Sequence, residues 1–241
     1  MISDRHKCIF VHIPKNGGAS IEELIWDISE RTEENLWLGF TKPHRNKYQT
    51  GGLQHLFAKY IQEEVGNDRF NAYWKFTMVR NPWDKAVSQF LYMQKRRDLR
   101  EYLGMKRHAS FIEYLHLIGQ KKHVHWAPQV DFILDENGTC IVDDIFRFEE
   151  YKNSISAIRS KLRIPDSLAT PHKNKSKRHP YWEYYTEETR GMVHEMFQSD
   201  IDYFNYEFNP DVSTDLKAMR PFPTPATWME SKLEDLKDKW R

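Results

Sequence analysis

Two hydrophobic patterns alternate along the chain: short continuous apolar runs, and longer segments with helical spacing. The runs 7–13 and 72–79 combine β-branched and aromatic residues, which is typical of strands buried on both faces. Helical spacing follows the first run at Ile21, Leu24, Ile25 and Ile28. The second run leads into 80–93, where Asn81 is expected as the N-cap and Pro82 as the first helical residue.

Further elements are predicted from spacing and turn residues. One apolar helix face is expected at Leu53, Leu56, Phe57, Tyr60, Ile61 and Val65, ending at Gly66-Asn67-Asp68. Other helices are expected at 110–118, at 149–162 and after Thr186. Residues 131–150 predict a hairpin with a Glu-Asn-Gly turn, or two strands joined by that turn.

Strands that alternate with helices indicate an α/β fold with a mainly parallel sheet covered on both faces. Ligands in such folds bind beyond the carboxyl ends of the strands. The segments 14–20 and 80–88 both follow a predicted strand, so we expect them to meet at one edge of the sheet.

Composition narrows the function classes. The 241 residues are 29% charged and 39% hydrophobic, as in a globular protein, and the net charge is only +1. Because no overall field attracts nucleic acid or a membrane, any anion site must be local. Cys8 and Cys140 lie in apolar runs and are expected to be reduced core thiols. The first residues lack a signal-peptide pattern and no segment is long enough to span a membrane, so a cytoplasmic location is expected.

The segment Pro-Lys-Asn-Gly-Gly-Ala-Ser at 14–20 has the features of an anion site. A helix N-terminus offers unpaired N–H groups and a partial positive charge, glycines allow close approach, and Lys15 adds a cation. The lysine precedes the glycines, which is not the order of a Walker loop and disfavours an ordinary kinase. A Gly-Gly turn with an exposed lysine explains this pattern equally well.

Two longer motifs favour an anion site over a plain Gly-Gly turn at 14–20. "FVHIPKNGGASI" together with "FTMVRNPWDKAVSQF" resembles the sulfotransferases that use 3′-phosphoadenosine-5′-phosphosulfate (PAPS), in the carbohydrate branch with the heparan sulfate 2-O-sulfotransferases and their bacterial relatives. Further similarity lies at 147–151, 174–188 and 200–208. The resemblance implies a three-layer α/β/α, P-loop-like sulfotransferase domain over residues 1–210. Residues 211–241 are expected to be a C-terminal appendage.

The resemblance also implies which residues bind the donor. The 5′-phosphosulfate would be held by Lys15, Asn16, Gly17, Gly18, Ala19 and Ser20. Arg80 and Ser88 would bind the 3′-phosphate. The alternatives are a strand-end arginine paired with Asp84 and a serine on a polar helix face, and the second is the simpler interpretation of Ser88 alone. The late basic loop would add Lys175, Ser176 and Arg178. Asn16 and Ala19 replace the family's usual threonines, and Ala19 has no side-chain donor.

Sulfuryl transfer to an alcohol needs a base and a group that stabilises the leaving phosphate. Lys15 suits the second task and histidine suits the first. By resemblance the base is His55, and His44 is the alternative. His123 and His125 form a potential metal pair on a predicted strand, but no third ligand is evident and no metal is expected. Glu22 and Glu23 lie too near the phosphate helix to be attractive bases.

The sequence therefore predicts transfer of a sulfuryl group from PAPS to a hydroxyl acceptor, which the resemblance indicates to be a carbohydrate. A small natural product or lipid head group as acceptor, a kinase-like phosphotransferase, and a non-catalytic binding module all stay open. The basic segment 95–108 would attract an acidic glycan or form a solvated face. The identity of the acceptor and the oligomeric state do not follow from the sequence.

Overall fold

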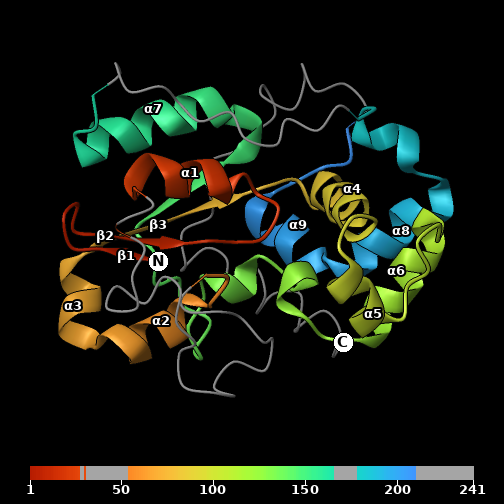
Figure 1. Cartoon of the computed structure of the whole chain (residues 1–241), viewed down its shortest axis with the longest axis horizontal. Coiled ribbons are helices and arrows are strands. Elements are labelled where there is room, and N and C mark those ends of the chain that lie inside the picture. Colours follow the sequence, from red (N-terminus) through yellow and green to blue (C-terminus); the bar gives the residue numbers. More distant parts are fainter. Residues whose placement is uncertain (28–29, 31–53, 166–177, 210–241) are drawn as a thin grey trace, which may run out of the picture.

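A four-stranded sheet in the order β1-β2-β3-β4 organises the molecule (Figure 1). The structure is a computed structural model that describes residues 1–27, 30, 54–165 and 178–209. The strands are β1 (Ile2–Ser3), β2 (Cys8–Val11), β3 (Trp74–Val79) and β4 (Asp144–Arg147). β2, β3 and β4 run parallel to one another, and β1 pairs antiparallel with β2. The predicted, mainly parallel sheet is confirmed.

Alternate residues of the central strands enter two different cores. Cys8, Phe10, Phe76 and Met78 pack with helices α1 (Gly18–Ile25) and α7 (Tyr151–Leu162). Ile9, Val11 and Val79 pack on the opposite side with α2 (Ala58–Val65) and α3 (Asn67–Ala72). Figure 1 shows α1 and α7 on one side of the sheet and α2 and α3 on the other. The continuous apolar runs arise because both faces of these strands are buried.

A helical region forms a third core beside the sheet. It contains α4 (Pro82–Met93), α5 (Arg97–Leu103), α6 (Phe111–Gln120), α8 (Glu187–Met196) and α9 (Gln198–Phe204). Short 3₁₀ turns occur at Val124–Trp126, Val130–Phe132, Phe148–Glu150 and Tyr181–Tyr184. α4 is central to this core, where Trp83, Val87 and Phe90 are buried. Because α4 starts directly after β3, its packing fixes the position of the 80–88 segment.

Several predicted helix starts are confirmed by their caps. The side chain of Asn81 accepts hydrogen bonds from the backbone N–H groups of Trp83 and Asp84, at 3.1 and 3.5 Å. Ser110 and Thr186 form reciprocal caps at the starts of α6 and α8. The helix predicted at 149–162 is also present, as α7.

Two predictions were wrong in detail. The helix expected from Leu53 begins only at Ala58, and His55 before it has a left-handed φ of 63°. The hairpin at 131–150 is reduced to one isolated bridge, Leu134 to Cys140, because the following chain joins β3 in parallel as β4 instead of pairing with its own upstream segment. The proposed appendage 211–241 lies outside the described residues. Among the described residues, no helix is both long and apolar enough to cross a bilayer.

Candidate active site

The segments that follow β2 and β3 line the same cavity, of about 440 Å³. From the first segment the cavity receives Lys15, Gly17, Gly18, Ala19 and Ser20. From the second it receives Arg80 and Ser88. The parallel register of β2 and β3 places both carboxyl ends at this edge, so the predicted meeting of the two segments is confirmed.

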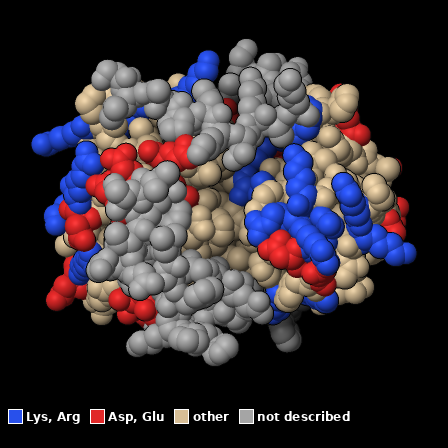
Figure 2. All heavy atoms as spheres, in the orientation of Figure 1, with Lys and Arg blue, Asp and Glu red and all other residues tan. Residues whose placement is uncertain are grey.

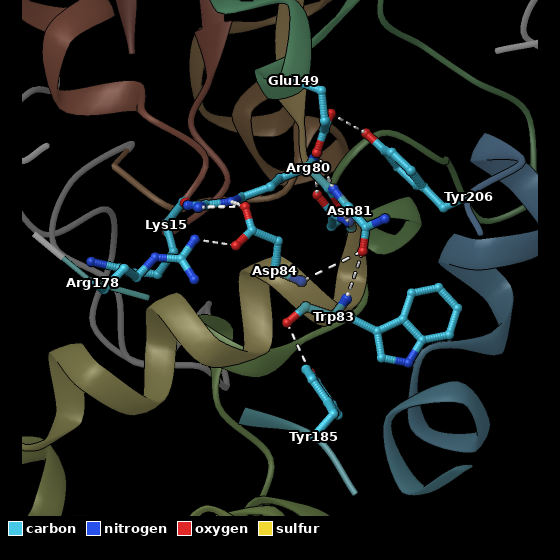
Figure 3. Close-up of polar contacts among 10 residues, drawn as sticks. Lys15, Arg80, Asn81, Trp83, Asp84, Glu149, Arg178, Tyr185 and Tyr206 are labelled. Carbon is cyan, nitrogen blue, oxygen red and sulfur yellow. Dashed lines mark hydrogen bonds and ion pairs between the residues drawn. The ribbon is translucent and has the colours of Figure 1, made fainter. Parts of the chain in front are cut away.

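Arg80 joins the two segments directly (Figure 3). Its Nη1 donates a 2.8 Å hydrogen bond to the backbone oxygen of Lys15. Its Nε and Nη2 contact one carboxylate oxygen of Asp84 at 2.7 and 2.6 Å. Its guanidinium also lies 4.0 Å from the ring centroid of Phe148. The pair with Asp84, named as the alternative for Arg80, is therefore present, and it orients an arginine that still lines the cavity.

Asp84 bridges two arginines. Arg178 contacts the other carboxylate oxygen, so Arg80 and Arg178 share one acid (Figure 3). Burial by itself would raise the pKa of Asp84, but the two guanidinium groups outweigh it and lower that pKa. Asp84 is thus ionised, and the three side chains together carry an excess positive charge beside the cavity.

The glycine segment is shaped by its neighbours. Gly17 has φ 79°, a left-handed conformation that glycine adopts without strain, and a side chain there would come within 3.0 Å of Phe148. A side chain at Gly18 would overlap the ring of His12. α1 starts at Gly18 with no side-chain cap from the described residues, and its first residues line the cavity, so the positive end of its dipole lies at the cavity.

Asn16 has a structural role within this loop. Its Nδ2 donates to the backbone oxygen of Met78 at 2.8 Å and to Oε1 of Gln129 at 2.7 Å. The residue is buried, and it does not line the cavity. The side-chain hydrogen bond to the donor that the sequence allowed for Asn16 is therefore not available in this conformation.

Lys15 lies close to several other positively charged side chains. Its Nζ lies 4.0 Å from the ring centroid of Tyr92, which also lines the cavity. Burial and the nearby charges of Arg80, Lys95, Arg178 and Arg96 lower the pKa of Lys15 to about 8. An anion in the cavity would relieve this repulsion and restore full protonation.

His55 lies in the cavity wall with a fixed tautomer. Its Nδ1 is 3.0 Å from the backbone oxygen of His12, which can only accept, so Nδ1 carries the proton. Desolvation and the neighbouring His12 lower the pKa of His55 to about 3. The ring is therefore neutral at physiological pH, and the unprotonated nitrogen is Nε2.

Two further histidines surround His55. The ring of His12 contacts it edge-on with centroids 4.4 Å apart, and the ring of His125 does so at 5.3 Å. Glu22 and Gln54 complete the group: Glu22 binds Nδ1 of His12, and Gln54 donates to both oxygens of Glu22, at 3.1 and 3.4 Å. His12, His125 and Gln54 all line the cavity.

Comparison with known proteins identifies the family. The sequence profile that describes the Sulfotransferase family matches residues 1–207, which is most of the chain. The chain belongs to the sulfotransferase family. The resemblance stated from the motifs is thereby confirmed.

Two relatives of this chain differ in sequence identity and in the length that they match. Carbohydrate sulfotransferase 10 of Xenopus laevis is 21% identical over 86% of this chain, which spans 66% of that frog protein, just under two thirds. An uncharacterized protein of Archaeoglobus fulgidus is 31% identical over 45% of this chain and 82% of its own length. No solved structure matches. The frog relative agrees with the carbohydrate branch inferred from the motifs.

The predicted site residues divide into three groups. The first group lines the cavity and consists of Lys15, Gly17, Gly18, Ala19, Ser20, His55, Arg80 and Ser88. Asn16 and Arg178 contact residues next to it without lining it. Lys175, Ser176 and the alternative base His44 lie outside the described residues.

Sequence reasoning missed His12, His125, Tyr92 and Phe148 in the cavity wall. The signal for His12 was present, because it directly precedes the Ile-Pro-Lys of the first motif. His125 was considered only as part of a metal pair on a strand. The prediction of a strand is wrong. His125 lies in the 3₁₀ turn Val124–Trp126, and its backbone N–H donates to Nδ1 of His123 at 3.2 Å.

Proposed function

We propose that this sulfotransferase transfers a sulfuryl group from PAPS to a hydroxyl of a carbohydrate acceptor. The observation that carries the proposal is the meeting of Lys15, the glycine segment, Arg80, Ser88 and His55 around one cavity. The three-layer, P-loop-like arrangement inferred from the motifs belongs to this proposal, and so does a cytoplasmic location. Both rest on sequence.

The donor would lie with its 5′-phosphosulfate at the N-terminus of α1 and its 3′-phosphate at Arg80 and Ser88. The helix dipole, Lys15 and Arg80 supply positive charge at both ends. Of the five N–H groups of Arg80, two bind Asp84 and one binds the oxygen of Lys15. The outer edge of the guanidinium can then offer its remaining two N–H groups to a phosphate.

Transfer proceeds in line. The acceptor oxygen forms a bond to sulfur while the bond between sulfur and the phosphate oxygen breaks. The hydroxyl proton moves to Nε2 of His55, which the hydrogen bond at Nδ1 leaves unprotonated. The ammonium of Lys15 stabilises the negative charge that develops on the leaving phosphate, and the product is 3′,5′-diphosphoadenosine.

A carbohydrate acceptor is supported by the motifs and by the frog relative. The basic segment 95–108 gives weaker support. Figure 2 shows its Lys and Arg side chains, in blue, interspersed with acidic ones over the region of α5. Arg96 pairs with Asp98 at 2.5 Å and Arg97 with Glu101 at 2.7 Å, which favours a solvated face for most of the segment.

The test is transfer of radiolabelled sulfate from PAPS to a panel of desulfated glycosaminoglycans, neutral oligosaccharides and phenols. Labelled glycan is the expected product. Label only on phenols would retain the reaction and overturn the carbohydrate acceptor. Stabilisation by ATP with Mg²⁺ but not by 3′,5′-diphosphoadenosine would overturn the donor and favour a phosphotransferase.

A further inference from the structure

Glu22 is a buried carboxylate that the proposed transfer does not use. It lies on α1, close to the cavity, and is only 3% exposed. Burying an ionised carboxylate is costly unless hydrogen bonds and opposite charge compensate for it. Burial raises the pKa of Glu22, but the charge and hydrogen bond of His12 and the amide of Gln54 outweigh it and lower that pKa. Glu22 is therefore ionised and acts as an acceptor from both neighbours.

Two hydrogen bonds, joined through the covalent structure of His12, link Glu22 to the proposed base. The carboxylate binds Nδ1 of His12, and the backbone oxygen of His12 accepts from Nδ1 of His55 at 3.0 Å. An ionised carboxylate only accepts, so Nδ1 of His12 must carry a proton. Each histidine is thus held through Nδ1, and each ring is fixed in rotation.

Two ring contacts add to this path. His12 packs edge-on against His55, with centroids 4.4 Å apart, and stacks on Phe10 in the core at 5.4 Å. His12 also fills the space that a side chain at position 18 would need. One imidazole therefore separates the proposed base from the start of the phosphate-binding helix.

We propose that Glu22 is a positioning residue of the active site: it holds His12 in the orientation that supports His55. This inference takes the identity of the reaction from the proposed function. The contacts among Glu22, His12 and His55 do not depend on that function. The negative charge of Glu22 also stabilises the imidazolium that forms when His55 takes a proton. The arrangement follows the logic of a carboxylate behind a catalytic histidine, with a second histidine between them.

The first test uses the wild-type protein. Two-bond ¹⁵N–¹H correlation spectra of ¹⁵N-histidine-labelled protein at pH 7.5 report which ring nitrogen is protonated. We expect a protonated Nδ1 for His12 and for His55, with Nε2 of His55 unprotonated. Signals are assigned with His12→Gln and His55→Gln. A wild-type His12 with an unprotonated Nδ1 would overturn the proposal without any further variant.

The second test is Glu22→Gln, with Glu195→Gln on the exposed face of α8 as the matched control. In E22Q we expect the His12 and His55 ring signals to change and the slow hydrolysis of PAPS by water to fall by about tenfold or more. The affinity for 3′,5′-diphosphoadenosine should stay within about threefold, because Glu22 does not contact the predicted donor residues Lys15 or Arg80 through any hydrogen bond among the described residues. Unchanged histidine spectra or an unchanged hydrolysis rate in E22Q would contradict the role of Glu22.

The two proposals fail in different ways. If wild-type protein neither binds 3′,5′-diphosphoadenosine nor hydrolyses PAPS, the proposed function is wrong, while the histidine spectra still report the path from Glu22. If wild-type protein does both and E22Q matches it in spectra and rate, only the positioning role is wrong.

Discussion

Arg80 donates a 2.8 Å hydrogen bond to the backbone oxygen of Lys15, although 65 positions separate the two residues in the chain. This contact ties the end of β3 to the loop after β2. The same guanidinium is held by Asp84 and by the ring of Phe148, and its side chain is 7% exposed. The orientation of Arg80 is thus set before any nucleotide arrives, which lowers the entropic cost of binding one.

Arg80→Lys should weaken nucleotide binding, because a lysine has one charged centre and cannot replace the planar fork. At ~100 times its dissociation constant, 3′,5′-diphosphoadenosine stabilises the wild type by ~2.7 kcal/mol, and a tenfold loss of affinity would reduce this to about 1.4 kcal/mol. Thermal unfolding with and without ligand measures the change. Arg97→Lys, on the exposed side of α5, is the control and should match the wild type. An equal ligand shift in both variants would remove Arg80 from the nucleotide site.

Nucleotide binding should take up a proton at alkaline pH. The pKa of Lys15 is lowered to about 8 in the free protein by burial and by the surrounding cations. Below pH 8 the amine is already charged, whereas above it the bound phosphates must recruit a proton, so affinity should fall as pH rises beyond 8. Calorimetry at pH 8.5 in buffers of different ionisation enthalpy counts the protons. The uptake should disappear in Lys15→Met, and equal uptake in that variant would assign the proton to another group.

His55→Gln should retain folding and nucleotide affinity but lose ~10²-fold or more in the rate of sulfuryl transfer, the usual contribution of a positioned base. The pKa of His55, lowered to about 3, keeps the ring neutral over the assay range, so no loss of rate is expected from its protonation between pH 6 and 8. The control is His116→Gln, an exposed histidine on α6. A fully active H55Q together with an inactive His44→Gln would move the base to His44.

Asn16→Ala should destabilise the fold more than it weakens nucleotide binding. The substitution removes a donor from the buried backbone oxygen of Met78 and one of the two donors to Oε1 of Gln129, where the N–H of Arg80 remains, and this costs ~1–3 kcal/mol. Urea unfolding measures the loss, and Asn137→Ala at an exposed turn is the control. If N16A unfolds like the wild type but binds nucleotide much more weakly, Asn16 contacts the ligand directly.

The pattern of apolar positions predicted the sheet and most helices because β2 and β3 are buried on both faces and because α4, α6 and α8 begin at side-chain caps. It also placed Lys15 and Arg80 at one edge, since parallel strands align their carboxyl ends. The same pattern failed at 54–57. There the apolar side chains Leu56 and Phe57 are buried ahead of the helix, so helical spacing arose without a helix.

The polar partners within the site were harder to predict. Glu22 was considered only as a base and set aside because it lies too near the phosphate helix, and only the fold shows that it pairs with His12, ten positions earlier. Asn16 appeared to be a substitute for a ligand-binding threonine, but Gln129 and Met78 occupy its amide. Such pairings depend on which distant segments pack together, and hydrophobic spacing carries no information about them.

The ring of His12 occupies the volume beside Gly18, and the carboxylate behind the ring prevents it from swinging aside. The two positions therefore restrict each other's evolution. A methyl group at 18 is compatible only with a smaller residue at 12, and a smaller residue at 12 removes one of the two partners of the acid at 22 and leaves it Gln54. We therefore expect substitutions at positions 12, 18 and 22 to occur together.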